Sequence, residues 1–111
     1  MIQQVRPSNL QAWLQSQSRP AVVLDVREPE ELQLASIQPA GFELLVIPMN
    51  DIPARLAELD PQRPVAVLCH RGARSQHVAM HLASNGFATV ANIAGGIDAW
   101  SLEHDGSVPR Y

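Results

Sequence analysis

Residues 64–76 read PVAVLCHRGARSQ, and this stretch decides the fold. An apolar run ends on the only cysteine of the chain, Cys69, a short loop with two arginines follows, and a helical pattern begins at Ser75. A buried strand that passes directly into a helix is the repeating unit of α/β proteins. Ligands of open α/β sheets bind at the carboxyl ends of the strands. The loop after this strand is therefore the predicted functional site.

Strands and helices alternate on both sides of this stretch. Apolar, β-branched runs at 21–26, 44–47 and 89–93 are typical of strands covered on both faces, and Val5 belongs to a short first strand. Helical patterns separate them, and the segment 35–43, with a proline and a glycine, is expected to be a loop. One of these patterns, which Asn50 or Asp51 can cap, predicts a helix that ends at Leu59, and the tail 102–111 is expected to be irregular. The sequence predicts an α/β fold in one domain over residues 1–111, with a mostly parallel five-stranded sheet and helices on both faces.

Composition excludes several classes of protein. A chain of 111 residues with 46% apolar and 17% charged residues has the make-up of one ordinary globular domain. One cysteine cannot form an internal disulfide, so nothing favours an oxidising compartment. The N-terminal residues lack the apolar core of a signal peptide, and no apolar run is long enough to span a membrane. A cytoplasmic protein without a membrane partner is the expectation.

The charges are unevenly distributed. The net charge is -3, yet residues 61–97 contain no Asp or Glu and carry Arg63, Arg71 and Arg74. Chance within buried strand and helix is one explanation, and a local positive field for an anionic substrate or a thiolate is the other. An acidic chain with few aromatic residues is not expected to bind nucleic acid.

Cys69 has features beyond those of an ordinary buried thiol. At the end of a strand and before a helix, loop N–H groups and the helix dipole can stabilise a thiolate. Gly72 permits the positive φ that a curled, anion-binding loop needs. Arg71 and Arg74 stand near a helix N-terminus, where cations are unfavourable unless an anion lies between them. We predict a catalytic loop whose thiolate handles an anion or a sulfur atom.

Three motifs also resemble a known family. The CHRGARS sequence at 69–75 is similar to the active-site loop of rhodanese-like sulfurtransferases, which has the pattern Cys-x-x-Gly-x-Arg-Ser. LDVREPEE at 24–31 resembles the early Asp-Val-Arg-Glu motif of that family, and GGIDAW at 95–100 its late Gly-Gly-x-x-x-Trp motif. The resemblance spans about residues 4–109 and implies a single rhodanese-like domain of the thiosulfate sulfurtransferase type. The segment 35–43 departs from the family, because the usual Gly-His-Ile-Pro-Gly-Ala is altered and its histidine is absent.

The resemblance implies a reaction and its participants. The Cys69 thiolate takes the outer sulfur of thiosulfate or a similar small anionic donor, and a thiophilic acceptor such as cyanide, a dithiol or a thiol protein removes it from the persulfide. No cofactor and no metal are expected. Substrate binding is expected from the rest of the loop, with Asp25 and Arg27 as possible supports of that loop. The residues expected to bind substrate are His70, Arg71, Gly72, Ala73, Arg74 and Ser75.

Individual roles within the loop follow from chemistry. Backbone N–H groups of residues 70–74 are expected to stabilise the terminal sulfur of the persulfide. Arg71 is expected to bind the sulfonate of the donor, and Arg74 to hold the loop together. Ser75 either donates to the sulfur or caps the helix. His70 is not expected to serve as a base, because neighbouring side chains on a tight loop diverge.

Other functions were weighed against this one. His77 and His81 have the spacing of a metal-binding pair, but no third ligand is evident in the sequence. Cysteine phosphatases and arsenate reductases hold an oxyanion in a loop with five residues between Cys and Arg, whereas four separate Cys69 from Arg74 here. The shorter loop favours a sulfur atom. A persulfide relay that serves a partner protein remains open, since sequence does not separate a carrier from an enzyme.

Overall fold

Five strands form the central sheet of the computed structural model, which describes residues 2–111. The strands lie in the order β1-β5-β4-β2-β3, and every neighbouring pair is parallel. The α/β class and the five-stranded sheet are confirmed, and the sheet is wholly rather than mostly parallel. The strands are β1 (Gln3–Val5), β2 (Val22–Asp25), β3 (Glu43–Val46), β4 (Val65–Leu68) and β5 (Val90–Ile93).

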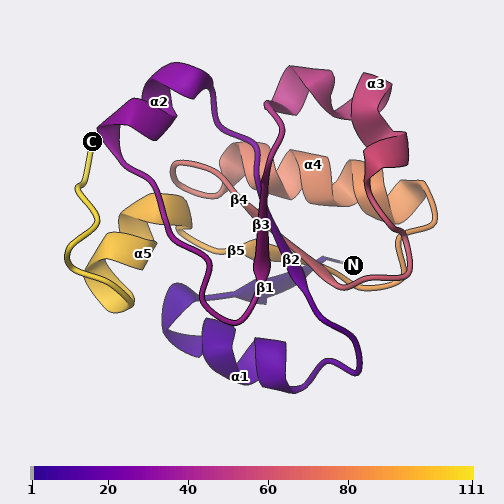
Figure 1. Cartoon of the computed structure of the whole chain (residues 1–111), viewed down its shortest axis with the longest axis horizontal. Helices are drawn as coiled ribbons and strands as arrows, with labels where there is room; N and C mark the ends of the chain where they lie inside the picture. Colours follow the sequence, from indigo (N-terminus) through magenta and orange to yellow (C-terminus); the bar gives the residue numbers. More distant parts are fainter. Residues whose placement is uncertain (1) are drawn as a thin grey trace.

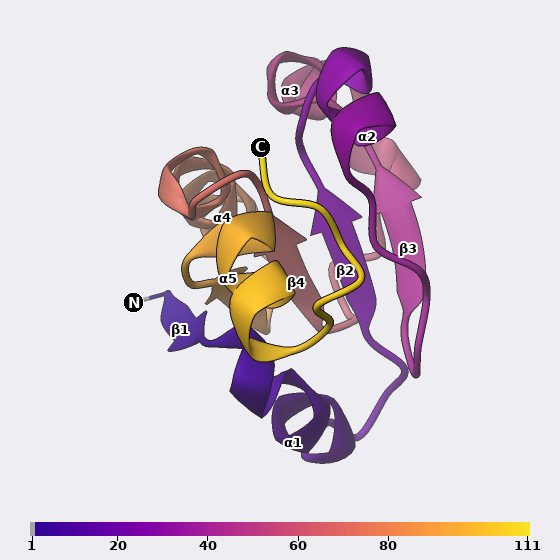
Figure 2. The ribbon, with the colours of Figure 1, turned by 90° about the vertical axis from the view of Figure 1, so that its left-hand side faces the viewer.

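Helices cover both faces of this sheet, as expected (Figures 1 and 2). The helix α1 (Leu10–Gln15) and the helix α5 (Gly96–Glu103) lie on one face. The helix α3 (Ile52–Arg55) and the helix α4 (Ala73–Ser84) lie on the other. The helix α2 (Pro29–Leu34) buries none of its residues completely and lies near the carboxyl end of β2. Short 3-10 helices complete the set at Pro7–Asn9, Met49–Asp51 and Leu56–Glu58.

The sheet separates two hydrophobic cores. Because successive strand residues point to opposite faces, Val23 packs with the α1 and α5 residues and Leu24 packs with those of α3 and α4. Both side chains are fully buried, which explains why β2 is a continuous apolar run in the sequence rather than an alternating one. At the end of β4, Leu68 is buried in the core with α1 and α5 and Cys69 in the core with α3 and α4, so packing on both faces holds Cys69 in position.

The segment 35–43, which departs from the family pattern, is without helix or strand as far as residue 42, and its last residue, Glu43, already belongs to β3. Three of its apolar side chains are nevertheless buried, and the Phe42 ring meets the Trp100 ring edge to face with centroids 6.2 Å apart. The segment thus connects α2 to the edge strand β3 while contributing to the α1/α5 core. Its buried members are Ala35, Ile37 and Phe42.

Two other expectations need adjustment. The single helix expected from Asn50 to Leu59 is broken into a 3-10 turn, the four-residue α3 and a second 3-10 turn. Pro53 supplies no N–H, so a long helix cannot run through it without losing a bond. The tail after α5 is irregular, as expected, but it folds back over the molecule and buries Val108 (Figure 2). Within residues 2–111 no helix has the length and apolar character that crossing a membrane requires.

Candidate active site

Cys69 lies immediately after β4, at the carboxyl end of the sheet. Its exposed fraction is 1%, and its sulfur has two polar neighbours. The N–H of Gly72 donates a hydrogen bond to Cys69 Sγ over 3.1 Å, and Ser75 Oγ lies 3.2 Å from the same atom. Both neighbours come from the next six residues, so the loop curls around the sulfur of its own first residue. The N–H of Gly72 suits a sulfur anion, since it can only donate to the sulfur.

Gly72 makes the curl possible. Its φ is +106°, which L side chains rarely adopt, and it is the cap residue of α4. The helix therefore starts at Ala73, two residues before the expected Ser75, and its first backbone bond runs from Gln76 N–H to Gly72 O. The N–H groups of Ala73, Arg74 and Ser75 precede this bond and have no acceptor within the helix. They form a field of partial positive charge beside Cys69.

The start of α5 supports the loop from behind. Ile97 N–H donates to Cys69 O over 2.9 Å, and Asp98 N–H donates to His70 O over 3.1 Å. A Cβ on Gly96 would lie 2.4 Å from His70 O, so only glycine allows this approach. The glycine pair at 95 and 96 thus places the backbone of α5 against the loop that begins at Cys69.

The two loop arginines have different surroundings. Arg74 forms a two-pronged ion pair with Glu31 of α2, with both N–O distances at 2.7 Å. Its anion is thus a protein carboxylate rather than a shared external one, which favours the loop-holding role for Arg74. Arg71 is exposed, and over residues 2–111 it has no salt-bridge partner. Its guanidinium is available for an anion from solution.

Glu31 connects this loop to the C-terminal tail. Its carboxylate also accepts a hydrogen bond from Tyr111 Oη over 2.9 Å. The hydrogen bonds from Arg74, with those from the backbone of Glu28 and from Tyr111, lower the pKa of Glu31 to about 2 despite partial burial. Burial raises the pKa of Tyr111. Glu31 is thus an anion at every physiological pH, and neither residue was identified from the sequence.

Asp25 and Arg27 form a second ion pair, separate from the pair of Arg74 and Glu31. The guanidinium meets the carboxylate with N–O distances of 2.8 and 2.9 Å, and the side chains are 2% and 0% exposed. Arg27 also donates to Ala35 O and to Tyr111 Oη, which links it through Tyr111 to Glu31. Within residues 2–111 no hydrogen bond or ion pair joins these two side chains to Cys69, and their support of the loop stays a prediction.

His70 faces the tail. Its ring stacks on the Tyr111 ring with centroids 4.0 Å apart, and its Nε2 lies 2.7 Å from Tyr111 O. These contacts occupy one ring face and Nε2, so a base for Cys69 is not needed to explain the position of this histidine. They make Tyr111 a wall of the site.

Asn92 of β5 is another residue that the sequence did not indicate. Its side chain is buried and accepts a hydrogen bond from Ser75 Oγ over 2.5 Å. Its amide nitrogen donates to Gly72 O and to Gln4 Oε1. Ser75 does not cap α4, because it lies inside the first turn and bonds to Asn92 and Cys69 instead.

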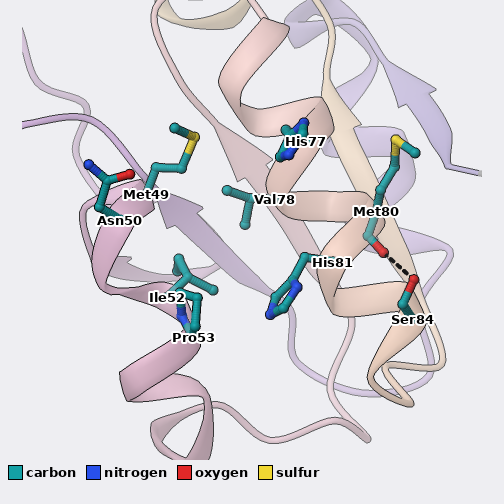
Figure 3. Close-up of a pocket in the computed structure, with 9 residues that line it drawn as sticks. All are labelled: Met49, Asn50, Ile52, Pro53, His77, Val78, Met80, His81 and Ser84. Carbon is teal, nitrogen blue, oxygen red and sulfur yellow. Dashed lines mark hydrogen bonds between the residues drawn. The ribbon is translucent and has the colours of Figure 1, made fainter.

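A groove of about 500 Å³ opens between α3 and α4 (Figure 3). Both His77 and His81 line it, together with Met49 and other apolar side chains, and no residue of 69–75 does. Among residues 2–111 no cluster of three or more His, Cys, Asp or Glu side chains could hold a metal ion. The groove is separate from the chemistry of Cys69.

Comparison with known proteins agrees with this geometry. The rhodanese-like domain family matches residues 7–103. The thiosulfate sulfurtransferase GlpE of Coxiella burnetii is 33% identical over 97 residues, which cover 87% of each chain. The rhodanese-like domain protein of Staphylococcus aureus superposes with a TM-score of 0.77 at 27% identity, over 99% of each chain. The chain therefore belongs to the rhodanese-like sulfurtransferase family.

Another relative carries a similar domain within a longer chain. The chloroplastic rhodanese-like/PpiC domain-containing protein 12 of Arabidopsis thaliana is 43% identical over 95 residues. These cover 82% of this chain, but the match spans only 30% of the plant protein. The roles of Cys69 and the loop residues, and the extent of the domain over 1–111, stay predictions.

Proposed function

We propose that the protein transfers sulfane sulfur from thiosulfate, or a similar small anionic donor, to a thiophilic acceptor through a persulfide on Cys69. The observation that carries the proposal is the placement of one thiol among free N–H groups at the start of α4, near Arg71, which forms no salt bridge within residues 2–111. Family membership and the 33% identity to a thiosulfate sulfurtransferase support the same reaction.

The reaction has two balanced steps. The Cys69 thiolate attacks the outer sulfur of thiosulfate, a new S–S bond forms, and sulfite leaves with the electron pair of the broken S–S bond. The enzyme then carries Cys–S–S⁻, whose terminal sulfur bears the charge. An acceptor such as cyanide or a thiolate attacks that sulfur and leaves with it, and the Cys69 thiolate is restored.

The loop residues have separate roles in these steps. The N–H groups at the start of α4 stabilise the anionic terminal sulfur, as an oxyanion hole stabilises oxygen. Arg71 binds the sulfonate of the donor and then releases it as sulfite. Arg74 fixes the loop through Glu31, since its guanidinium is already occupied.

A persulfide carrier is the alternative within the same chemistry. The acceptor would then be a thiol or dithiol protein, and the plant relative that carries the domain in a longer chain supports such an arrangement. A carrier and an enzyme differ in turnover, because a carrier transfers its sulfur quickly to one protein and slowly to small acceptors.

Sulfur loading tests the proposal. Thiosulfate treatment should add the mass of one sulfur atom to the intact protein, and peptide mapping should place it on Cys69. Thiocyanate should form when cyanide follows, and Cys69→Ser should abolish both signals. A wild-type protein that takes up no sulfur from any donor, yet hydrolyses aryl phosphates, would disprove the proposal.

Arg71→Gln sharpens the assignment of the donor site. The variant should raise KM for thiosulfate about tenfold or more, because a charge-assisted contact to the sulfonate is lost. Arg63→Gln is the matched control: Arg63 lies in the same acid-free stretch but pairs with Glu43 at the other end of the sheet. An equal change in KM for both variants would indicate a general effect of charge rather than a contact.

A further inference from the structure

The carboxamide of Asn92 has only one orientation that satisfies its neighbours. Gly72 O is a carbonyl oxygen and can only accept, and it lies 3.2 Å from Asn92 Nδ2. Gln4 Oε1 accepts a second hydrogen bond from the same nitrogen over 2.9 Å. The oxygen of Asn92 must therefore face Ser75, which lies 2.5 Å away.

This orientation determines where the Ser75 hydroxyl points. Asn92 Oδ1 cannot donate, so the single hydroxyl proton of Ser75 goes to Asn92. Ser75 Oγ then presents a lone pair to Cys69 Sγ at 3.2 Å. That arrangement is favourable when Cys69 is a thiol, because S–H donates to Oγ, and unfavourable when the sulfur is a thiolate.

Burial removes any substitute for that proton. Cys69, Ser75 and Asn92 are 1%, 0% and 3% exposed, so solvent does not reach the three groups freely. If the hydroxyl turns to stabilise a thiolate, Asn92 Oδ1 is left buried without a donor, which costs free energy. Cys69 Sγ and Asn92 Oδ1 therefore compete for the one hydroxyl proton of Ser75.

We propose that Asn92 is a positioning residue: it competes with the Cys69 sulfur for the Ser75 hydroxyl and so restrains thiolate formation in the free protein. The proposal deepens the proposed function and rests on it. In the persulfide the charge moves to the terminal sulfur and Sγ is neutral, so the Ser75 proton returns to Asn92. Asn92 thus lowers the free energy of the persulfide relative to the free thiolate.

The rate of alkylation of Cys69 by iodoacetamide as a function of pH tests the proposal without any sulfur donor. Asn92→Leu should lower the midpoint of the pH profile by about half a pH unit to one unit, the size of one net hydrogen bond. Ser75→Ala removes both the acceptor of the S–H proton and the donor to the thiolate, and with them the group for which Asn92 competes. In the Ser75→Ala background, the Asn92→Leu change should lose most of its effect.

The double-mutant cycle separates this competition from the other contact of Asn92. Loss of the bond to Gly72 O also loosens the loop, but that effect is present with or without Ser75. An Asn92→Leu shift of equal size and sign in both backgrounds would overturn the proposal, and so would an upward shift confined to the Ser75 background. If thiosulfate loading fails while the cycle behaves as expected, the proposed function is wrong and the competition still holds.

A measurement on the wild-type protein covers the case in which Asn92→Leu does not fold. The ¹³Cγ resonance of Asn92 should move upfield with the same pH midpoint as the alkylation rate, as its carbonyl loses the Ser75 donor. Ser75→Ala should abolish most of that movement. A resonance that does not titrate with Cys69, or titrates equally without the hydroxyl, would contradict the competition.

Discussion

The loop at residues 69–75 is held from two sides by different means. On the α5 side the contact is backbone to backbone: Ile97 and Asp98 donate to the carbonyl groups of Cys69 and His70 across Gly96. On the α2 side it is side chain to side chain, through the Arg74–Glu31 pair and Tyr111, with the buried Asp25–Arg27 pair beneath.

The difference concerns what each support tolerates. The backbone contact carries no net charge and is insensitive to pH and salt, but it leaves no room for a side chain. The ionic support tolerates small movements, yet it depends on protonation and, where solvent reaches it, on salt. The loop therefore has one support that is fixed and one that conditions can weaken.

The largest effect is expected from the buried ion pair. Asp25→Asn leaves Arg27 charged and fully buried without its carboxylate, and should lower the free energy of unfolding by about 3–5 kcal/mol. Urea denaturation measures the loss. Replacing both residues, as Asp25→Asn with Arg27→Met, should restore part of it, and a double variant less stable than the single one would contradict this account.

A methyl group on the α5 side should have the next largest effect. Gly96→Ala places its Cβ 2.4 Å from His70 O at a φ of +60°, and should cost about 3 kcal/mol of stability together with most of the activity. Gly86→Ala is the control, since φ is +87° there but nothing lies within 4 Å. It should cost only about 1 kcal/mol, for the backbone strain alone. Equal losses would remove the steric argument.

The α2 side should respond to pH where the α5 side does not. Glu31→Gln should cost about 1.5 kcal/mol at pH 7. The folded-state pKa of Glu31, at about 2, lies below its ordinary value of 4.5, so the stabilisation is complete above about pH 5 and is lost as pH falls toward 2.

Thermal unfolding of the wild type and of Glu31→Gln should thus differ at pH 7 and converge as pH falls toward 2. Glu58→Gln is the control: its pair with Arg55 is exposed, and its removal should leave the unfolding temperature unchanged. A constant difference for Glu31→Gln at every pH would show that its charge is not the stabilising feature.

The smallest effect is expected from the tail. Tyr111→Phe keeps a ring to stack on His70 but loses the hydroxyl that links Arg27 to Glu31, and should cost about 1 kcal/mol. Hydrogen exchange of the loop amides should become faster in the variant. Unchanged exchange would mean that the stacking alone holds the tail against the loop.

Much of this arrangement follows from local sequence. Buried parallel strands are continuous apolar runs, and the passage from strand to helix at Cys69 is visible in residues 64–76, so the fold and the position of the loop were predictable. The turn of the loop around the Cys69 sulfur was also predictable, because it needs a positive φ at one residue and the sequence has a glycine, Gly72, at that position. The prediction of one helix over 50–59 was wrong, because Pro53 lacks the N–H that a residue inside a long helix donates.

The supports of the loop were not predictable in this way. The carboxylate beside Arg74 comes from α2, the ring on His70 from the tail, and the acceptor of Ser75 from β5. Each depends on which distant segments the fold brings together, and none has a pattern of its own in the sequence. An unfavourably placed arginine indicated that an anion was near, but not that Glu31 would supply it.

The stacking of Tyr111 on His70 has a practical consequence for anyone who handles this protein. A chain that continues past Tyr111, whether natural or added as an affinity tag or a fluorescent partner, leaves the fold beside His70 and the loop at residues 69–75. A group attached there would lie close enough to His70 to respond to the proposed sulfur loading of Cys69, and it would also change the surroundings of the loop. Affinity tags and immobilisation surfaces should therefore be attached away from Tyr111, whereas a fluorescent sensor of sulfur loading should be attached after it.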